Sequence, residues 1–167
     1  DSEPQIDRAE ELNQKWGVKT GDLWLIGEHR LLRGDSTQAG DIERVIGGGS
    51  IGAIIADPPY GTGMNAETGI GNSTVAMQMI GDEDSSLAKK LFSIWSPLSQ
   101  VQIWWGANYY SSSLPDSVCW AIWDKDHHGM TFADAELAWV SIRGPVRVFR
   151  HAWSGNHRDS ERSEDRN

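Results

Sequence analysis

The sequence predicts an α/β fold built on a mainly parallel sheet, and three observations support this prediction. Apolar segments of strand length alternate with segments of helical character along the chain. The run at 51–56 is continuously apolar, as is typical of a strand buried on both faces. The 167 residues fit one domain with a hydrophobic core, and a single cysteine means that no internal disulfide supports the fold.

The first elements are a polar lead and a hairpin. Residues 1–20 have little apolar periodicity, and we interpret them as a linker or as the last turns of an upstream element. The apolar segment 23–26 and the segment Arg30-Leu31-Leu32-Arg33 flank a turn at 27–29 and predict a β-hairpin.

A helix and the apolar strand follow the hairpin. Ser36 or Thr37 is suited to cap a helix over 41–46, and Gly47-Gly48-Gly49 ends that helix. The strand at 51–56 then completes the order strand, helix, strand. This order indicates a crossover unit in a parallel sheet.

The second half of the chain predicts one more helix and several strands. Residues 61–80 form a long loop without a clear period, which in a compact domain is often functional. A helix over 87–95 is capped by Asp84-Ser85-Ser86 and closed by Pro97. Further expected elements are strands at 101–105, 118–123 and 146–150, a short helix at 108–113, and a structured segment at 132–140 that follows a loop at 124–131.

Composition restricts the class of protein. The net charge of -9 argues against a protein that holds nucleic acid by bulk electrostatics alone. The lone Cys119 indicates a reducing compartment and excludes a cysteine metal cluster. No apolar run approaches the length of a membrane span, and no signal pattern begins the chain, so we expect a cytoplasmic protein without a membrane partner.

The most informative segment is Asp57-Pro58-Pro59-Tyr60, which directly follows the apolar strand. Ligands of open α/β sheets bind beyond the carboxyl ends of the strands, where this tetrapeptide falls. The two prolines fix the backbone, so the Asp57 carboxylate and the Pro58 carbonyl are held as rigid acceptors beside the flat ring of Tyr60. A tight turn that happens to contain two prolines is the alternative.

Two acceptors and a stacking ring suit an exocyclic amino group on a planar base. The lone pair of an aryl amine is delocalised into its ring, which makes it a poor nucleophile. Hydrogen bonds from both of its hydrogens to Asp57 and Pro58 draw the nitrogen toward a tetrahedral geometry. It is then able to attack a methyl group in line, with the protein supplying position and electrostatics.

The tetrapeptide and four other segments resemble the DNA amino-methyltransferases of the N6-adenine/N4-cytosine type, in the permuted arrangement with Asp-Pro-Pro-Tyr ahead of the cofactor loop. The similarity is greatest to phage and prophage methylases, some of which carry an upstream ParB-like domain. The matching segments are 33–36, 56–60, 103–110, 120–125 and 132–139.

The resemblance implies a three-layer Rossmann-like methyltransferase fold and S-adenosylmethionine as cofactor. It implies a catalytic and target-binding part at 21–155, after a linker at 1–20 and before a polar tail at 156–167. Asp57, Pro58, Pro59 and Tyr60 would then be the catalytic set, acting on a base flipped out of double-stranded DNA in a bacterial or phage-infected cell. Asp before Pro-Pro-Tyr resembles the adenine-specific members, with cytosine N4 methylation as the alternative.

Asp35 resembles the acidic residue that contacts the adenosyl part of the cofactor. The alternative is an Asp at a helix start, where the helix dipole favours a negative charge.

The family also needs a glycine-rich loop after a strand, and this chain has none. Residues 47–52 fit G-x-G-x-x-G but follow a helix, and Gly61-Thr62-Gly63 belongs to the catalytic loop. The chain starts without methionine, so we expect a truncated fragment of incomplete fold, inactive by itself, whose missing loop lies beyond Asn167. A non-catalytic nucleic-acid-binding module is the competing interpretation.

DNA contacts are predicted near the same pocket. Trp123 and Lys125 follow a strand end on the side of Asp57, and we expect them to line the target site. Arg147 and Arg150 belong to a stretch, 141–158, with four arginines and no acidic residue, which is either a phosphate-facing strip or the solvated charge of an edge strand. The tryptophans at 104, 105, 120 and 139 are expected in the core. The pair His127-His128 lacks a third ligand, so we predict no metal.

Overall fold

The computed structural model describes residues 8–61, 81, 83–126 and 133–152. The chain divides into two compact units, residues 1–50 (unit 1) and residues 51–167 (unit 2). This boundary falls inside the range 21–155 that we expected to form one part. No helix in the described ranges has the length and apolar character that a membrane span requires.

Unit 1 contains a helix, a hairpin and a second helix. Helix α1 covers Ala9–Trp16, and strands β1 (Leu23–Ile26) and β2 (His29–Leu32) pair antiparallel, with Ile26 opposite His29 at the turn. Helix α2 covers Ala39–Ile46. The predicted hairpin is therefore confirmed, and β1 and β2 form a two-stranded sheet of their own.

The sequence predicted the C-terminal end of α2 correctly but not its N-cap. The helix stop is confirmed, because Gly47 adopts a left-handed conformation and its N–H caps the carbonyl of Glu43. The capping prediction was wrong: Gln38, not Ser36 or Thr37, is the N-cap residue, and its side chain makes no capping bond. The Asp35 carboxylate instead binds the backbone N–H of Thr37 at 2.8 Å, so an Asx turn precedes the helix.

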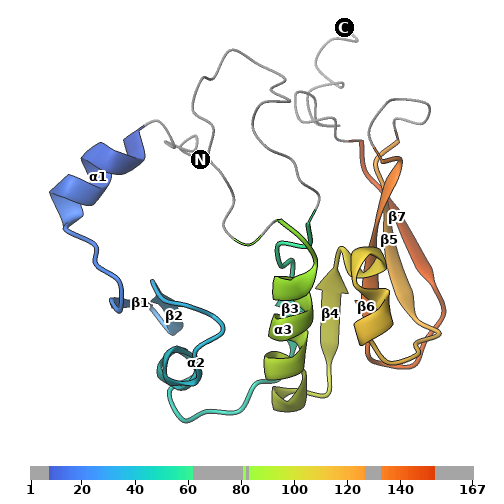
Figure 1. Ribbon diagram of the computed structural model, residues 1–167, viewed down its shortest axis with the longest axis horizontal. Helices are drawn as coiled ribbons and strands as arrows, with labels where there is room; N and C mark the ends of the chain where they lie inside the picture. The colour runs from blue at the N-terminus through green and yellow to red at the C-terminus, as the bar shows by residue number, and fades with distance from the viewer. Residues whose placement is uncertain (1–7, 62–80, 82, 127–132, 153–167) are drawn as a thin grey trace, which may run out of the picture. The chain divides into compact units, whose positions relative to one another are not determined.

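Unit 2 is built on a five-stranded sheet in the order β3-β4-β6-β5-β7 (Figure 1). In that view α3 lies in front of β3 and beside β4. The strands are β3 (Ile54–Ala56), β4 (Gln102–Trp105), β5 (Trp120–Asp124), β6 (Ala135–Val140) and β7 (Arg147–Arg150), and the helix α3 covers Ser86–Trp95. Three short 3-10 turns, η3 (Ser96–Leu98), η4 (Ala107–Tyr109) and η5 (Ser111–Ser113), complete the described part.

The α/β class is confirmed, but the sheet is mixed rather than mainly parallel. The pairs β3–β4 and β5–β7 are parallel, whereas β6 runs antiparallel to both β4 and β5. A parallel connection needs a crossover of about a dozen residues or more, usually with a helix. The segment between β5 and β6 is shorter than that, so β6 returns beside β5 in the opposite direction.

The predicted crossover unit lies elsewhere in the chain. We expected the hairpin, the helix at 41–46 and the strand at 51–56 to form it, but β1 and β2 pair only with each other. The parallel crossover of the described sheet is β3-α3-β4, in which α3 begins beside Asp84, whose carboxylate accepts the Ser86 N–H at 2.6 Å. Asp84-Ser85-Ser86 was predicted to cap this helix; Ser85 is its N-cap residue, but the Ser85 side chain makes no capping bond.

The core lies between α3 and one face of the sheet. Phe92 of α3 makes edge contacts with Trp104 at 5.1 Å and with Trp139 at 5.6 Å between ring centroids. Trp104 and Trp139 are register partners, so their side chains share this face, and both are buried. Trp120 packs against the same cluster, and Trp105 is half-buried on the other face.

The strand at 51–56 is shorter and more exposed than its composition suggested. Only Ile54–Ala56 is a strand, and Ile55 is 73% exposed. The prediction that this strand is buried on both faces was therefore wrong. The reason is topological: β3 is an edge strand, and α3 packs on the face of Ile54, not on that of Ile55.

Candidate functional site

The candidate site lies where four strands end together. Strands β3, β4, β5 and β7 run in one direction, so their carboxyl ends meet at one edge of the sheet, together with the amino end of β6. The tetrapeptide Asp57-Pro58-Pro59-Tyr60 leaves β3 at this edge. Asp57 is exposed, Pro58 is buried, and Pro59 and Tyr60 are half-buried.

The Tyr60 ring is held by residues that follow β4. It stacks on Tyr109 with the ring centroids 4.8 Å apart and the planes inclined by 17°. Gly106, the first residue after β4, has a φ of 64°, and a β-carbon at this position would overlap the Tyr60 ring. The absence of a side chain at Gly106 therefore makes room for the ring of the tetrapeptide.

Two ionisable groups beside the tetrapeptide have shifted pKa values. Although the Asp57 residue is exposed, its neighbours shield the carboxylate in part from water; this desolvation and, secondly, the negative charge of Glu136 raise the pKa of Asp57. Burial, followed by the charges of Asp57 and Tyr60, raises the pKa of Tyr110, which stays neutral and donates a hydrogen bond to the Trp105 carbonyl at 2.8 Å. Asp57, Tyr60, Tyr110 and Glu136 thus share one electrostatic environment.

Lys125 forms an ion pair with Glu136 in this environment. Its ammonium lies 2.5 Å from Glu136 Oε1 and 5.5 Å from the ring centroid of Trp123. The Lys125 side chain is 11% exposed and that of Glu136 28% exposed. Trp123 and Glu136 are register partners and share the sheet face opposite α3. The structure therefore brings together the two residues that we expected to line the target site.

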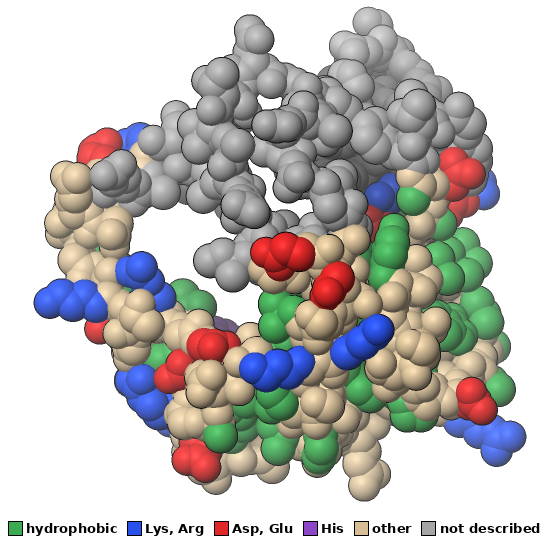
Figure 2. All heavy atoms as spheres, in the orientation of Figure 1, with side chains coloured by type: hydrophobic (Ala, Val, Ile, Leu, Met, Phe, Trp, Pro, Cys, Tyr) green, Lys and Arg blue, Asp and Glu red, His purple; other side chains and the backbone are tan. Residues whose placement is uncertain are grey.

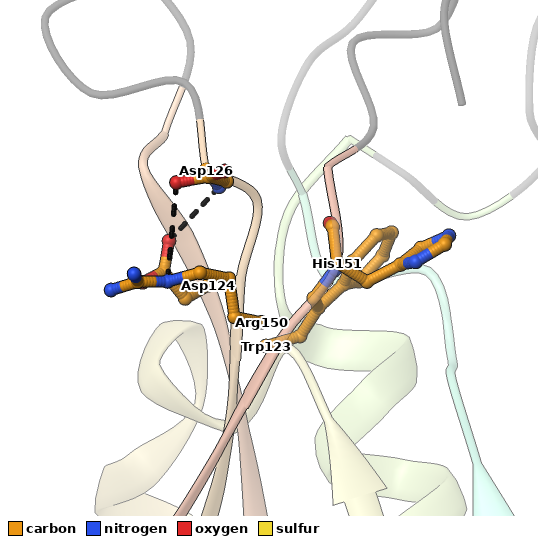
Figure 3. A network of polar contacts seen from close by, with 5 residues as sticks. All are labelled: Trp123, Asp124, Asp126, Arg150 and His151. Atoms are coloured by element: carbon orange, nitrogen blue, oxygen red, sulfur yellow. Dashed lines mark hydrogen bonds and ion pairs between the residues drawn. The ribbon is translucent and has the colours of Figure 1, made fainter. Parts of the chain in front are cut away.

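The two arginines lie on different faces of the sheet edge. Arg147 is opposite Ala121 in the register, on the face of Trp123, whereas Arg150 is opposite Asp124 on the other face. The Arg150 Nε is 3.1 Å from Asp124 Oδ2 and 3.9 Å from Asp126 Oδ1. Figure 3 shows this acidic pair and Arg150 on one side of the strands, with Trp123 beside His151 on the other.

The charged side chains do not form one basic surface on the face drawn in Figure 2. Lys and Arg lie there singly among acidic and other side chains. Any phosphate contact of the described residues on this face would therefore depend on single cations rather than on a continuous strip. The described part of the arginine-rich stretch, 141–152, contains the exposed β7 with Arg147 and Arg150 at its ends, and the exposed Arg143 before it.

Asp35 lies in unit 1, whereas the tetrapeptide lies in unit 2. The Asp35 carboxylate accepts hydrogen bonds from the Thr37 N–H at 2.8 Å and from the Gln38 side chain at 3.3 Å. Its own N–H donates to Asp41 at 2.8 Å. These contacts are those expected of an Asp at a helix start, the alternative to a cofactor contact.

The described residues do not build the methionine side of an S-adenosylmethionine site. No strand within the described ranges is followed by a complete Gly-x-Gly segment, and Gly47-Gly48-Gly49 follows a helix. The described part of the chain also contains no group of three His, Cys, Asp or Glu side chains placed to hold a metal. His127 and His128 lie outside the described residues.

Two surface hollows lie away from the tetrapeptide. One belongs to unit 1 and is lined by apolar side chains of α1 and the hairpin, among them Trp16, Trp24 and Leu31. The other, in unit 2, is lined by Pro115, Trp120 and neighbours, at the edge where β5 begins. Neither includes a residue that the sequence singled out for catalysis.

Comparisons of the chain with family models, with curated proteins and with solved structures gave no match. The function therefore has to be argued from the residues and their geometry.

Three residues of the site carried no predicted role. Glu136, Gly106 and Tyr109 all lie at the edge where the strands end, but on different segments from the tetrapeptide. Gly106 had a readable signal, because a glycine directly after an apolar strand often marks a close approach. Tyr109 and Glu136 had none, since only the strand order places them beside Tyr60 and Asp57.

Proposed function

We propose that the chain is the catalytic and target-binding part of a DNA methyltransferase that acts on the exocyclic amino group of a flipped base, N6 of adenine, with N4 of cytosine as the alternative. The observation that carries the proposal is the position of Asp57-Pro58-Pro59-Tyr60 at the carboxyl edge of the sheet. The Tyr60 ring stacks there on Tyr109, and Gly106 leaves room for it. Ligands of open α/β sheets bind at such an edge.

In this proposal the residues of the chain act on the amino group. The Asp57 carboxylate and the Pro58 carbonyl each accept one of its N–H bonds, which fixes the nitrogen and turns its lone pair out of the base plane. Tyr60 stacks on the base and replaces part of the stacking lost when it leaves the duplex. The ionised Asp57 carboxylate is the stronger acceptor, and its raised pKa places the loss of that charge at a higher pH than for an ordinary Asp.

The methyl donor of the proposal is S-adenosylmethionine, whose chemistry is an electrophilic methyl group. The described residues offer it one candidate contact, Asp35, and they do not form a pocket for its methionine part. We therefore derive no step through the cofactor from this chain. The proposal includes a three-layer Rossmann-like fold, double-stranded DNA as partner, and a cytoplasmic site of action in a bacterial or phage-infected cell.

The experiment is methyl transfer by the full-length protein. It is incubated with labelled S-adenosylmethionine and unmethylated duplex DNA, and the digested DNA is analysed by mass spectrometry. N6-methyladenine is the expected product, and N4-methylcytosine would select the cytosine alternative. Asp57→Ala should abolish transfer, whereas Asp116→Ala, an exposed carboxylate before the start of β5, should not. Absence of transfer, or full activity of Asp57→Ala, would overturn the proposal.

A second candidate is a nucleic-acid-binding module without catalysis. It is favoured by one observation, the lack of a Gly-x-Gly segment after any strand in the described ranges. Both candidates predict that these 167 residues alone bind S-adenosylmethionine weakly or not at all. Calorimetry that detects micromolar binding would contradict that prediction. The coding sequence after Asn167 separates the two, because a strand followed by a glycine-rich loop belongs to the enzyme.

A further inference from the structure

Tyr109 stands out as the residue in closest aromatic contact with the tetrapeptide. Its ring and that of Tyr60 are inclined by only 17°, with centroids 4.8 Å apart, which is an offset stack. A stack of this kind covers one face of Tyr60 and leaves the ring oriented by its neighbour. A base that stacks on Tyr60 would take the face turned away from Tyr109.

The backbone of Tyr109 is anchored, while its side chain reaches out of the core. Ala107, the first residue of η4, is 0% exposed, and Tyr110, which follows η4, is 1% exposed. Tyr110 is tied to the Trp105 carbonyl, and the Tyr109 N–H donates to the Gly106 carbonyl at 3.0 Å. The Tyr109 residue, by contrast, is 48% exposed. Its ring therefore adds little to the core, and Tyr60 is the aromatic partner that it contacts.

We propose that Tyr109 is a positioning residue, which backs the Tyr60 ring so that the opposite face is presented to an unstacked base. This inference rests on the proposed function, because it assigns Tyr109 a part in the same site. Holding Tyr60 in one rotamer before the base arrives removes an ordering cost that would otherwise be incurred at binding. Gly106 complements this role, since the lack of a side chain there lets the Tyr60 ring settle against the backbone after β4.

The opposite role would give the opposite result. If Tyr109 occupied the place of the base on Tyr60 in the free protein, it would compete with the base and have to move aside. Removal of the Tyr109 ring would then increase the stacking of the base on Tyr60 and the rate of methyl transfer. The sign of the effect in a Tyr109 variant therefore decides between a backing ring and a competing ring.

The test uses the full-length protein and the DNA site identified by sequencing its methylated products. Tyr109→Leu removes the planar ring but keeps an apolar side chain, and Tyr109→Phe keeps the ring. Trp16→Leu, an exposed tryptophan of α1, is the matched control. We measure kcat and KM for DNA, and also the yield of photocross-linking between Tyr60 and an oligonucleotide with 5-iodouracil in place of the target base.

Tyr109→Leu should lower both kcat and the Tyr60 cross-link by about two- to tenfold, which is the factor that one aromatic pair supplies. Tyr109→Phe and Trp16→Leu should stay within about twofold of the wild-type protein. Unchanged or increased values for Tyr109→Leu, in a wild-type background that methylates DNA, would overturn the role of Tyr109 alone. A wild-type protein that transfers no methyl group would overturn the proposed function and this inference with it.

Discussion

Lys125 and Glu136 form an ion pair of 2.5 Å, Nζ to Oε1, on the sheet face opposite α3. Lys125 follows β5 and Glu136 lies in β6, so the pair joins two antiparallel neighbours at the edge where Asp57 leaves β3. The pair has two consequences. It offsets the charge of a lysine that the proposed function would place near DNA, and it places a carboxylate close enough to act on Asp57.

The first prediction concerns the stability of this pair. Glu136→Gln leaves the more deeply buried ammonium without its counter-charge, whereas Lys125→Met leaves a carboxylate that is more exposed to water. Each should lower the free energy of unfolding by about 1–3 kcal/mol, with Glu136→Gln the more costly. The double variant should cost less than the sum of the two. Urea unfolding of the four proteins measures this, and strict additivity would show that the two groups do not interact.

The second prediction concerns the pH dependence of methyl transfer. The ionised Asp57 carboxylate is a stronger N–H acceptor than the protonated acid, so the rate should fall as the pH drops through its pKa. Glu136 raises that pKa, so Glu136→Gln should lower it and move the acid limb of kcat/KM to lower pH. The Lys125 ammonium, no longer offset by the charge of Glu136, acts in the same direction. Glu43→Gln, a change on α2, is the control. An acid limb that stays in place or moves to higher pH would contradict the coupling of Glu136 to Asp57.

The third prediction separates backbone strain from steric overlap. Gly106 and Gly17 have φ values of 64° and 61°, but a β-carbon overlaps the Tyr60 ring only at Gly106 and meets nothing within 4 Å at Gly17. Both alanine variants should cost about 1–2 kcal/mol for the left-handed backbone. Only Gly106→Ala should also displace Tyr60 and reduce methyl transfer, by about a hundredfold. Equal activity of the two variants would rule out a role for the close contact.

The fourth prediction concerns DNA affinity. Arg147 is exposed on β7, so a contact with one phosphate should contribute about one unit to the slope of log K against log salt. Arg147→Gln should remove this contribution. Arg150→Gln should have less effect, because Asp124 already offsets its charge. Arg8→Gln, which breaks an exposed pair with Glu11, is the control. An unchanged salt slope for Arg147→Gln would place the phosphate contacts elsewhere.

Local sequence rules predicted most elements and few of their partners. The hairpin, the glycine stop after α2 and the start of α3 at Asp84-Ser85-Ser86 were predictable, because each depends on residues within a few positions of one another. The direction of β6, the exposure of Ile55 and the separate two-stranded sheet were not. They depend on which strand pairs with which, and a local pattern is the same for a parallel and an antiparallel neighbour.

The sequence by itself determined the chemistry that this chain offers: the carboxylate of Asp57, two prolines that fix the backbone, and the ring of Tyr60 directly after an apolar strand. Only the tertiary structure decided what surrounds them. In the folded chain Tyr109 stacks on Tyr60, and Gly106 lies next to the Tyr60 ring. The charge of Glu136 raises the pKa of Asp57. The physical reason is that stacking and electrostatic effects act over a few ångströms in space, and residues 57, 106 and 136 come close only because β3, β4 and β6 are neighbours in one sheet.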